Sequence, residues 1–454
     1  MKLIYQPQDK PKLSQLIPFA LQQLLAIMAA TIAVPNIIGH GMSPSAALFG
    51  AGIGTIVYLL FTKFRSPVFL GSSFAFLGSM AAAFAGGVSM SLGYLGLIIG
   101  AVFAGLVYVV IAIIVKFTGA GWVSKIMPAV VIGPTVAIIG LSLAGNAVGD
   151  LFKGNILDAE GTPVANGYIC LVVGLVTLAV TMLCAVYGKK MARMIPFIIG
   201  IVSGYALAAI LTVIGNAAGV EELKIINFSM FADMKWYPEF TFITAFSGGF
   251  ETGEVGSIGA YIGSIAVAYV PVAFVVFAEH IADHKNISSI IEKDLLEDPG
   301  LHRTLLGDGI GSMVGAIFGG CPNTTYGESV GCVAISGNAS VSTILATGII
   351  AMVISFIAPF STFLATIPSC VMGGVCMALY GFIAVSGLKM VQKVDLEDNR
   401  NLFVVSVILI AGIGGMTLKF GQVTITEVAC ALVLGILTNV MLGRKKKAEE
   451  TSEK

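Results

Sequence analysis

Long uncharged runs dominate the pattern of this chain. Residues 66–115 and 329–388 contain no Asp, Glu, Lys or Arg, and each run is long enough for at least two membrane-crossing helices. Apolar stretches begin near residues 15, 45, 67, 91, 126, 166, 193, 261, 305, 326, 341, 363, 401 and 422. The pattern predicts an all-α polytopic membrane protein with about fourteen transmembrane segments.

Composition agrees with this class. The chain is 57% hydrophobic and 11% charged, whereas a soluble domain carries about 25% charged residues. The net charge is zero, so no acidic or basic partner is indicated, and we expect no nucleic-acid binding. The seven cysteines are scattered through apolar segments without metal-ligand spacing. We therefore expect buried free thiols, no metal and no cofactor.

The placement of basic residues predicts the topology. Of the 25 Lys and Arg, 21 lie in the termini and even-numbered loops, and the opposite side receives Lys153, Lys224, Lys235 and Lys419. Cytoplasmic loops attract basic residues, so both termini are predicted to be cytoplasmic and the protein to be multi-pass in the cell membrane. The predicted parts are a cytoplasmic N-terminus (1–14), a first seven-span repeat (15–215), an external loop with a short interfacial helix (216–258), a second seven-span repeat (259–443) and a basic cytoplasmic tail (444–454).

Two segments interrupt the helical pattern. Residues 65–76 and 319–328 combine Pro, Gly and small hydroxyl residues, and each then resumes as a short apolar helix. They fall in the third and tenth spans, which are equivalent places in two halves of seven. Broken segments at matching positions are typical of inverted-repeat transporters with a mid-membrane site. Two simple re-entrant kinks are the alternative.

Carboxylates at membrane depth supply the candidate chemistry. Glu279 ends the uncharged run that begins at Pro271, and Glu328 opens the second uncharged run. Glu279 and Asp283 are i,i+4 neighbours on one helix face, where two like charges repel each other and favour a shared proton. An intramembrane carboxylate is costly and is therefore a functional candidate. His280 is interpreted as structural, and His284 as marking the cytoplasmic end of the helix.

The other groups in the broken segments suit a flat ligand. Backbone N–H groups at the two helix starts can bind carbonyl oxygens, and carboxylates accept from ligand N–H groups. Phe74 and Tyr326, one from each broken segment, are placed to sandwich a ring. These groups describe a pyrimidine or purine better than a sugar or an inorganic anion, because an anion site would need an Arg or Lys at depth.

Five motifs in this order resemble the nucleobase–ascorbate transporters, also called nucleobase:cation symporters, and within them the bacterial uracil permeases. The motifs are Gln22-Gln-Leu-Leu-Ala-Ile-Met-Ala-Ala-Thr31 with Val34-Pro35, Gly71-Ser-Ser-Phe-Ala-Phe76, Ala278-Glu-His280, Asp298-Pro-Gly-Leu-His-Arg303, and Pro322-Asn-Thr-Thr-Tyr-Gly-Glu328. The resemblance runs from about Leu16 to the last span. It implies fourteen spans in two inverted repeats, a core domain and a gate domain, homodimers, and proton-driven uptake.

The resemblance also implies roles for individual residues. Glu279 and Glu328 match the two carboxylates that hold the base. Phe74, Tyr326, Gly327 and Glu328 match the residues that give stacking and backbone contacts. The proton-coupling candidates are Glu279 and Asp283.

The chain departs from the family pattern in four places. Asp283 stands where uracil permeases often have His and purine-transporting members often have Asp. Gln23 stands where relatives commonly have His, and Ser329 stands where they have an Asn linked to transport. The closing Thr-Arg or Thr-Gly of the signature is replaced by Ser336-Gly337.

The sequence therefore predicts a transporter, not an enzyme, that imports uracil with a proton. Xanthine or another oxopurine is the alternative substrate. Two further alternatives are an anion carrier or channel on the same fold and an intramembrane enzyme built on Gly307-Asp308-Gly309.

Overall fold

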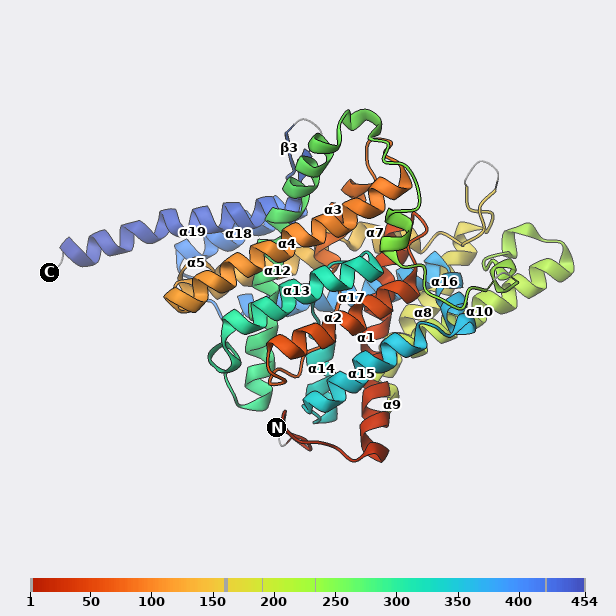
Figure 1. The fold of residues 1–454 in the computed structure, drawn as a ribbon, viewed down its shortest axis with the longest axis horizontal. Helices are drawn as coiled ribbons and strands as arrows, with labels where there is room; N and C mark the ends of the chain where they lie inside the picture. Colours follow the sequence, from red (N-terminus) through yellow and green to blue (C-terminus); the bar gives the residue numbers. More distant parts are fainter. Residues whose placement is uncertain (1–2, 159–161, 190, 233, 421–422, 453–454) are drawn as a thin grey trace.

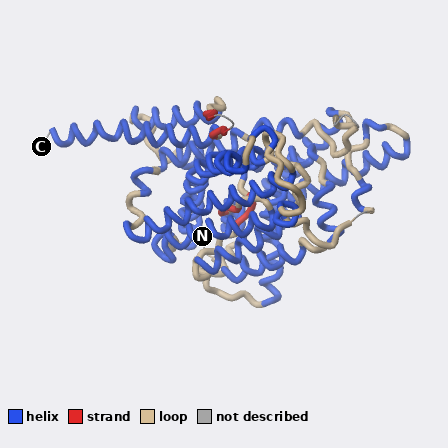
Figure 2. The backbone as a smooth tube through the Cα atoms, turned by 45° about the horizontal axis from the view of Figure 1, so that its top comes forward, coloured by secondary structure: helices blue, strands red, loops and turns tan. Residues whose placement is uncertain are grey.

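The computed structural model describes residues 3–158, 162–189, 191–232, 234–420 and 423–452. Within these residues eight helices are long and apolar enough to cross a membrane, and a ninth span results if the bent pair α15–α16 counts as one. The predicted helical multi-pass architecture is confirmed at this level. Figure 1 shows the helices packed side by side, and Figure 2 shows how little of the chain is strand.

The α-helices are α1 (Leu13–Ile38), α2 (Pro44–Phe61), α3 (Leu77–Ala83), α4 (Met90–Thr118), α5 (Val123–Ile126), α6 (Ala129–Ser142), α7 (Ala144–Asp150), α8 (Gly167–Tyr187), α9 (Met191–Met194), α10 (Pro196–Ala218), α11 (Thr241–Ala245), α12 (Ile258–Ile291), α13 (Leu301–Gly319), α14 (Gly327–Ser336), α15 (Val341–Ile354), α16 (Ala358–Thr366), α17 (Ser369–Val391), α18 (Asn399–Ile413) and α19 (Glu427–Ser452). The strands are β1 (Leu70–Ser72), β2 (Asn323–Thr325), β3 (Leu418–Phe420) and β4 (Val423–Ile425). Short helical turns occupy η1 (Phe74–Phe76), η2 (Glu221–Leu223), η3 (Phe228–Phe231), η4 (Gly253–Val255) and η5 (Leu296–Gly300).

Most predicted segment starts lie within about one helical turn of an observed element. The start predicted near 363 is wrong, because α15 and α16 are bent by 88° at residues 355–357 and the next long helix begins only at Ser369, after Pro368. The start predicted at 422 lies outside the described residues, and α19 begins at Glu427. The ends of the predicted terminal segments, residues 1–2 and 453–454, also lie outside them.

The two interrupted segments meet each other in the middle of the fold. Strand β1 pairs antiparallel with β2, and Gly71 lies opposite Thr324. Pro67 and Pro322 lack the N–H groups that a continuous helix would use. Across the pair, Ser73 N–H donates to the Pro322 carbonyl at 2.9 Å, and the Asn323 side chain ties β2 to α2 by donating from Nδ2 to the Gly50 carbonyl at 3.0 Å. The predicted helix interruptions are therefore confirmed, and they form one crossed unit.

The helices pack in two groups. In the first group, α13 packs on α2 and α4, α15 packs on α2, and α12 packs on α4. In the second group, α17 packs on α6 and α8, α10 packs on α8, and α18 packs on α6 and α19. Close backbone approach is built into the first group, because a Cβ on Gly50 of α2 would lie 2.4 Å from the Gly315 carbonyl oxygen of α13. Figure 2 shows the C-terminal end of α19 projecting from the rest of the molecule.

Candidate functional site

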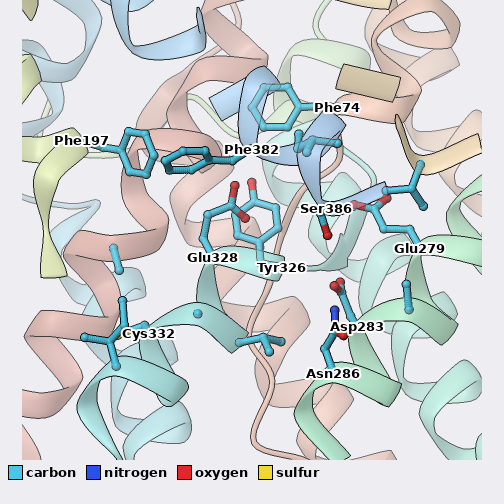
Figure 3. Close-up of a pocket in the computed structure, with 18 of the residues that line it drawn as sticks. Phe74, Phe197, Glu279, Asp283, Asn286, Tyr326, Glu328, Cys332, Phe382 and Ser386 are labelled. Carbon is cyan, nitrogen blue, oxygen red and sulfur yellow. The ribbon is translucent and has the colours of Figure 1, made fainter. Parts of the chain in front are cut away.

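A cavity of about 430 Å³ lies between the two helix groups. Its lining includes all six residues predicted for the site from the sequence, which are Phe74, Glu279, Asp283, Tyr326, Gly327 and Glu328. Figure 3 shows Glu328 and Tyr326 side by side, with Glu279 and Asp283 on the neighbouring helix and Phe74 at one end. The structure therefore brings together residues more than 250 positions apart in the chain.

One face of α12 lines the cavity. Glu279, Asp283 and Asn286 follow one another at helical spacing on this face, as their i,i+4 and i,i+3 relation requires. Asp283 Oδ2 accepts a 2.8 Å hydrogen bond from the Thr325 hydroxyl, which ties α12 to β2. Within the described part of the chain, the half-buried Glu279 carboxylate has no hydrogen-bond partner. Its acceptor oxygens are thus available to a ligand.

The start of α14 forms the adjacent wall. Tyr326 precedes this helix, and its hydroxyl donates to the Ser72 carbonyl at 2.8 Å. The ring lies on Gly71, where an added Cβ would meet it at 2.3 Å. Glycine at position 71 is therefore needed to seat this ring. The first N–H groups of α14 lack intrahelical partners, as at every helix start, and suit an electronegative ligand atom.

Phe74 closes one end of the cavity. Its ring contacts Tyr380 of α17 edge-on, with ring centroids 5.3 Å apart and an interplanar angle of 83°. Phe74 lies in η1, directly before α3, and its ring packs against α17 of the second helix group. A flat ligand beside Tyr326 and Glu328 would lie against this junction.

The opposite wall was missed by sequence reasoning. Phe197 of α10 and Phe382 of α17 pack edge-on with centroids 5.7 Å apart, and Val136 and Ser386 line the cavity beside them. Figure 3 shows both phenylalanine rings facing Glu328 across the space. These helices are apolar throughout, so nothing in their pattern distinguishes a cavity-lining phenylalanine from one that faces lipid.

Charge around the cavity is unequal. Three carboxylates line it, and among its described lining residues Arg193 is the single Lys or Arg, which is exposed at the rim. Carboxylates accept hydrogen bonds from ligand N–H groups and repel anions at this depth. The arrangement favours a neutral ligand that carries N–H donors, or a cation.

The other face of α12 is packed instead of open. His280 Nδ1 lies 2.6 Å from Asp308 Oδ2 on α13, and its Nε2 lies 3.0 Å from the Thr304 hydroxyl. His284 stacks on His280 with ring centroids 4.0 Å apart, and Tyr58 contacts its Nε2 at 2.7 Å. All of these side chains are buried, so His280 has the structural setting that the sequence suggested.

Two interpretations of this region change. His284 does not mark the end of its helix, because α12 continues to Ile291 and caps with Glu292 in the left-handed conformation. Asp308, the residue behind the enzyme alternative, is fully buried against His280 and is absent from the cavity lining. The Gly307-Asp308-Gly309 motif thus packs α13 and gives the enzyme alternative no support.

Comparison with known proteins places this geometry in a family. Residues 14–420 match the model of the permease family. The chain is 38% identical to a uracil permease of Bacillus subtilis (strain 168), with 98% of this chain and 97% of that protein covered. It is 35% identical to a uracil permease of Escherichia coli (strain K12), with 94% and 91% covered. It is 30% identical to the putative pyrimidine permease RutG of the same strain, with 97% and 92% covered.

Solved structures show the same fold at low identity. The transmembrane domain of the cyanobacterial bicarbonate transporter BicA aligns with a TM-score of 0.60 at 16% identity, covering 93% of this chain and 96% of that one. The murine anion transporter Slc26a9, in an inward-facing state, aligns with a TM-score of 0.63 at 13% identity, covering 97% and 69%. The sequence matches decide the family: the chain belongs to the permease family, the nucleobase–ascorbate transporters or nucleobase:cation symporters.

Proposed function

We propose that this protein imports uracil by proton symport across the cytoplasmic membrane. The observation that carries the proposal is the convergence of Glu279, Asp283 and Glu328 with the start of α14 on one cavity. Uracil offers two N–H donors and two carbonyl acceptors on a flat ring, which complement carboxylates, backbone N–H groups and aromatic edges. The relatives of 35–38% identity that are named uracil permeases support the same substrate.

The binding roles follow from the walls of the cavity. Glu279 and Glu328 accept hydrogen bonds from the ring N–H groups, and N–H groups at Gly327 and Glu328 donate to a carbonyl oxygen. Tyr326 and Phe74 contact the ring itself. Apolar surface from Phe197 and Phe382 covers the remaining side.

The proton sits among the cavity carboxylates. Three carboxylates that share one cavity repel one another, so a proton shared by Glu279 and Asp283 stabilises the loaded state. A proton that enters with the base gains about 2.3 kcal/mol per 100 mV of membrane potential. A potential of ~150 mV therefore supports accumulation of a few hundredfold.

The transport movement is a displacement of the two helix groups relative to each other. We infer that the fourteen segments are spans in two inverted repeats, with β1–η1–α3 and β2–α14 as the equivalent broken spans 3 and 10. The group containing α1–α4 and α12–α15 is the core domain, and the group containing α6, α8, α10 and α17–α19 is the gate domain. Because the cavity lies between them, motion of one against the other carries base and proton across. The functional unit is a homodimer with cytoplasmic termini.

Uptake of labelled uracil into proteoliposomes tests the proposal. An imposed inward proton gradient drives accumulation, an equal Na⁺ gradient does not, and excess xanthine does not compete. Competition by xanthine would instead assign an oxopurine substrate, in line with Asp283 at its position. Uptake driven by Na⁺ alone would overturn the proton coupling and leave the substrate standing.

A further inference from the structure

A buried hydrogen-bonded junction lies directly behind Glu328. It joins three elements: α1, the extended segment before β1, and the first turn of α14. We propose that Ser329, held by Gln23, is a positioning residue that fixes the Glu328 carboxylate for base recognition. This inference rests on the proposed function and adds to it two residues that lie outside the cavity lining.

The junction is built on one hydroxyl oxygen. Gln23, buried in the middle of α1, donates from Nε2 to Ser329 Oγ at 2.5 Å and lies 3.4 Å from the Ser329 carbonyl oxygen. The backbone N–H of Phe69 donates to the same Oγ at 3.1 Å. Ser329 is fully buried and Gln23 is 3% exposed, so water does not substitute for either contact. One serine oxygen therefore accepts from two separate elements.

The position of Ser329 in its helix links the junction to the site. Consecutive residues of an α-helix point about 100° apart, so Glu328 reaches the cavity while Ser329 points to α1. On the other side of Glu328, the Tyr326 N–H donates to the Phe69 carbonyl at 3.2 Å. Phe69 thus holds the chain both before and after Glu328. Rotation of the first turn of α14 would break both contacts.

The two side chains form a matched pair. Gln23 and Ser329 are two of the positions at which this chain departs from the pattern of its family, and the structure places them in direct contact. The long Gln23 side chain donates from its amide to the hydroxyl of the short Ser329 side chain. The hydrogen bond gives each of the two departures a partner in the other.

Binding of uracil and its N-methylated forms to purified protein tests the positioning role. We expect Ser329→Ala to weaken uracil binding about tenfold, since two buried donors lose their acceptor and Glu328 loses its fixed position. Gln23→Ala should give a similar loss, and the double variant should lose little more than either single one. Ser329→Thr, which keeps the hydroxyl, should restore most of the affinity. Ser336→Ala, at the other end of α14, is the matched control and should bind like the wild type.

Methylated ligands separate positioning from general support of the fold. For 1-methyluracil or 3-methyluracil, whichever lacks the N–H that reaches Glu328, Ser329→Ala should cause no further loss. Equal loss for all three ligands, or unchanged uracil affinity in folded Ser329→Ala protein, would overturn the positioning role. Strictly additive losses in the double variant would overturn the matched pair. Wild-type protein that fails to bind uracil would instead overturn the proposed substrate.

Discussion

The two faces of α12 treat buried polar groups in opposite ways. On the cavity face, Glu279 has no partner among the described residues and Asp283 has the Thr325 hydroxyl. On the packed face, one residue further along, His280 is bonded to both Asp308 and Thr304. Burial alone does not separate a functional carboxylate from a structural one. The separating property is whether the group faces the cavity, where a ligand can reach it, or packs against a neighbouring helix.

The largest effect is expected at Glu279. Glu279→Gln keeps the size of the side chain but removes its charge and its proton-binding site, so gradient-driven uracil uptake should fall more than about 100-fold. The melting temperature should stay equal or rise, because one of three mutually repelling carboxylates is neutralised. Transport assays and thermal unfolding of the same preparation measure both. Glu297→Gln, in the exposed connection after α12, is the control and should transport normally.

Glu328→Ala should weaken uracil binding strongly. A hydrogen bond to a charged group contributes about 1.5–3 kcal/mol, so the loss amounts to about 10- to 150-fold in affinity. Titration calorimetry on detergent-purified protein measures it. If Glu328→Ala and Glu279→Gln, tested separately, both accumulate uracil like the wild type, neither carboxylate belongs to the binding site.

A glycine in the cavity wall allows a steric test of where the base binds. Gly331 lies one turn after Gly327 on α14, lines the cavity, and has no atom within 4 Å of the place where a Cβ would stand. Gly331→Phe should therefore fill the cavity and block binding without a clash in the fold. Gly263→Phe, on an exposed face of α12 with the same open surroundings, should bind normally. Normal binding by Gly331→Phe would place the base elsewhere.

On the packed face the expected effect is on stability. Asp308→Ala leaves His280 Nδ1 without its buried hydrogen-bond partner, and an unpaired buried polar group costs about 1–3 kcal/mol. We expect lower yield of folded protein and a lower melting temperature, with uracil affinity in the remaining folded fraction within about threefold of wild type. A stable Asp308→Asn protein that binds uracil but no longer transports it would contradict a purely structural role for the packed face, because that face would then also carry the proton.

The smallest effect is expected at the contact between the two regions. Thr325→Val removes the hydroxyl that donates to Asp283 and keeps the shape of the side chain. One neutral-to-charged hydrogen bond is lost, so uracil affinity or transport rate should change by about three- to tenfold. Thr438→Val on α19 is the control, because its hydroxyl donates to the Leu434 carbonyl of its own helix and it does not line the cavity.

The helical class and the two site carboxylates could be predicted from the sequence because membrane burial makes charged residues rare. Glu279 and Glu328 stand out in uncharged runs, and Pro322 with its glycines marks the broken segment. The pairing of β1 with β2 could be expected only in outline, because register depends on contacts such as Asn323 to Gly50. The sharp bend between α15 and α16 was missed for a similar reason, since both helices are apolar.

The roles of neighbouring residues were harder to predict. From the sequence alone, three further polar residues are as plausible functional groups as Glu279: His280, His284 and Asp308. The structure shows that they form hydrogen bonds within the protein, where α12 packs against α2 and α13. Phe197 and Phe382 carry no signal at all in an apolar helix. The contact between Gln23 and Ser329, 306 residues apart, depends entirely on the fold.

Uracil-dependent proton movement tests the central claim most directly. Proteoliposomes with a pH indicator inside and no imposed gradient are given external uracil, and the internal pH is followed together with labelled uracil. If the cavity face of α12 carries the proton, the interior should acidify in step with uracil entry for the wild-type protein and should not acidify for Glu279→Gln. Uracil entry without acidification in the wild type, or equal acidification in Glu279→Gln, would contradict the assignment of the proton to the cavity face of α12.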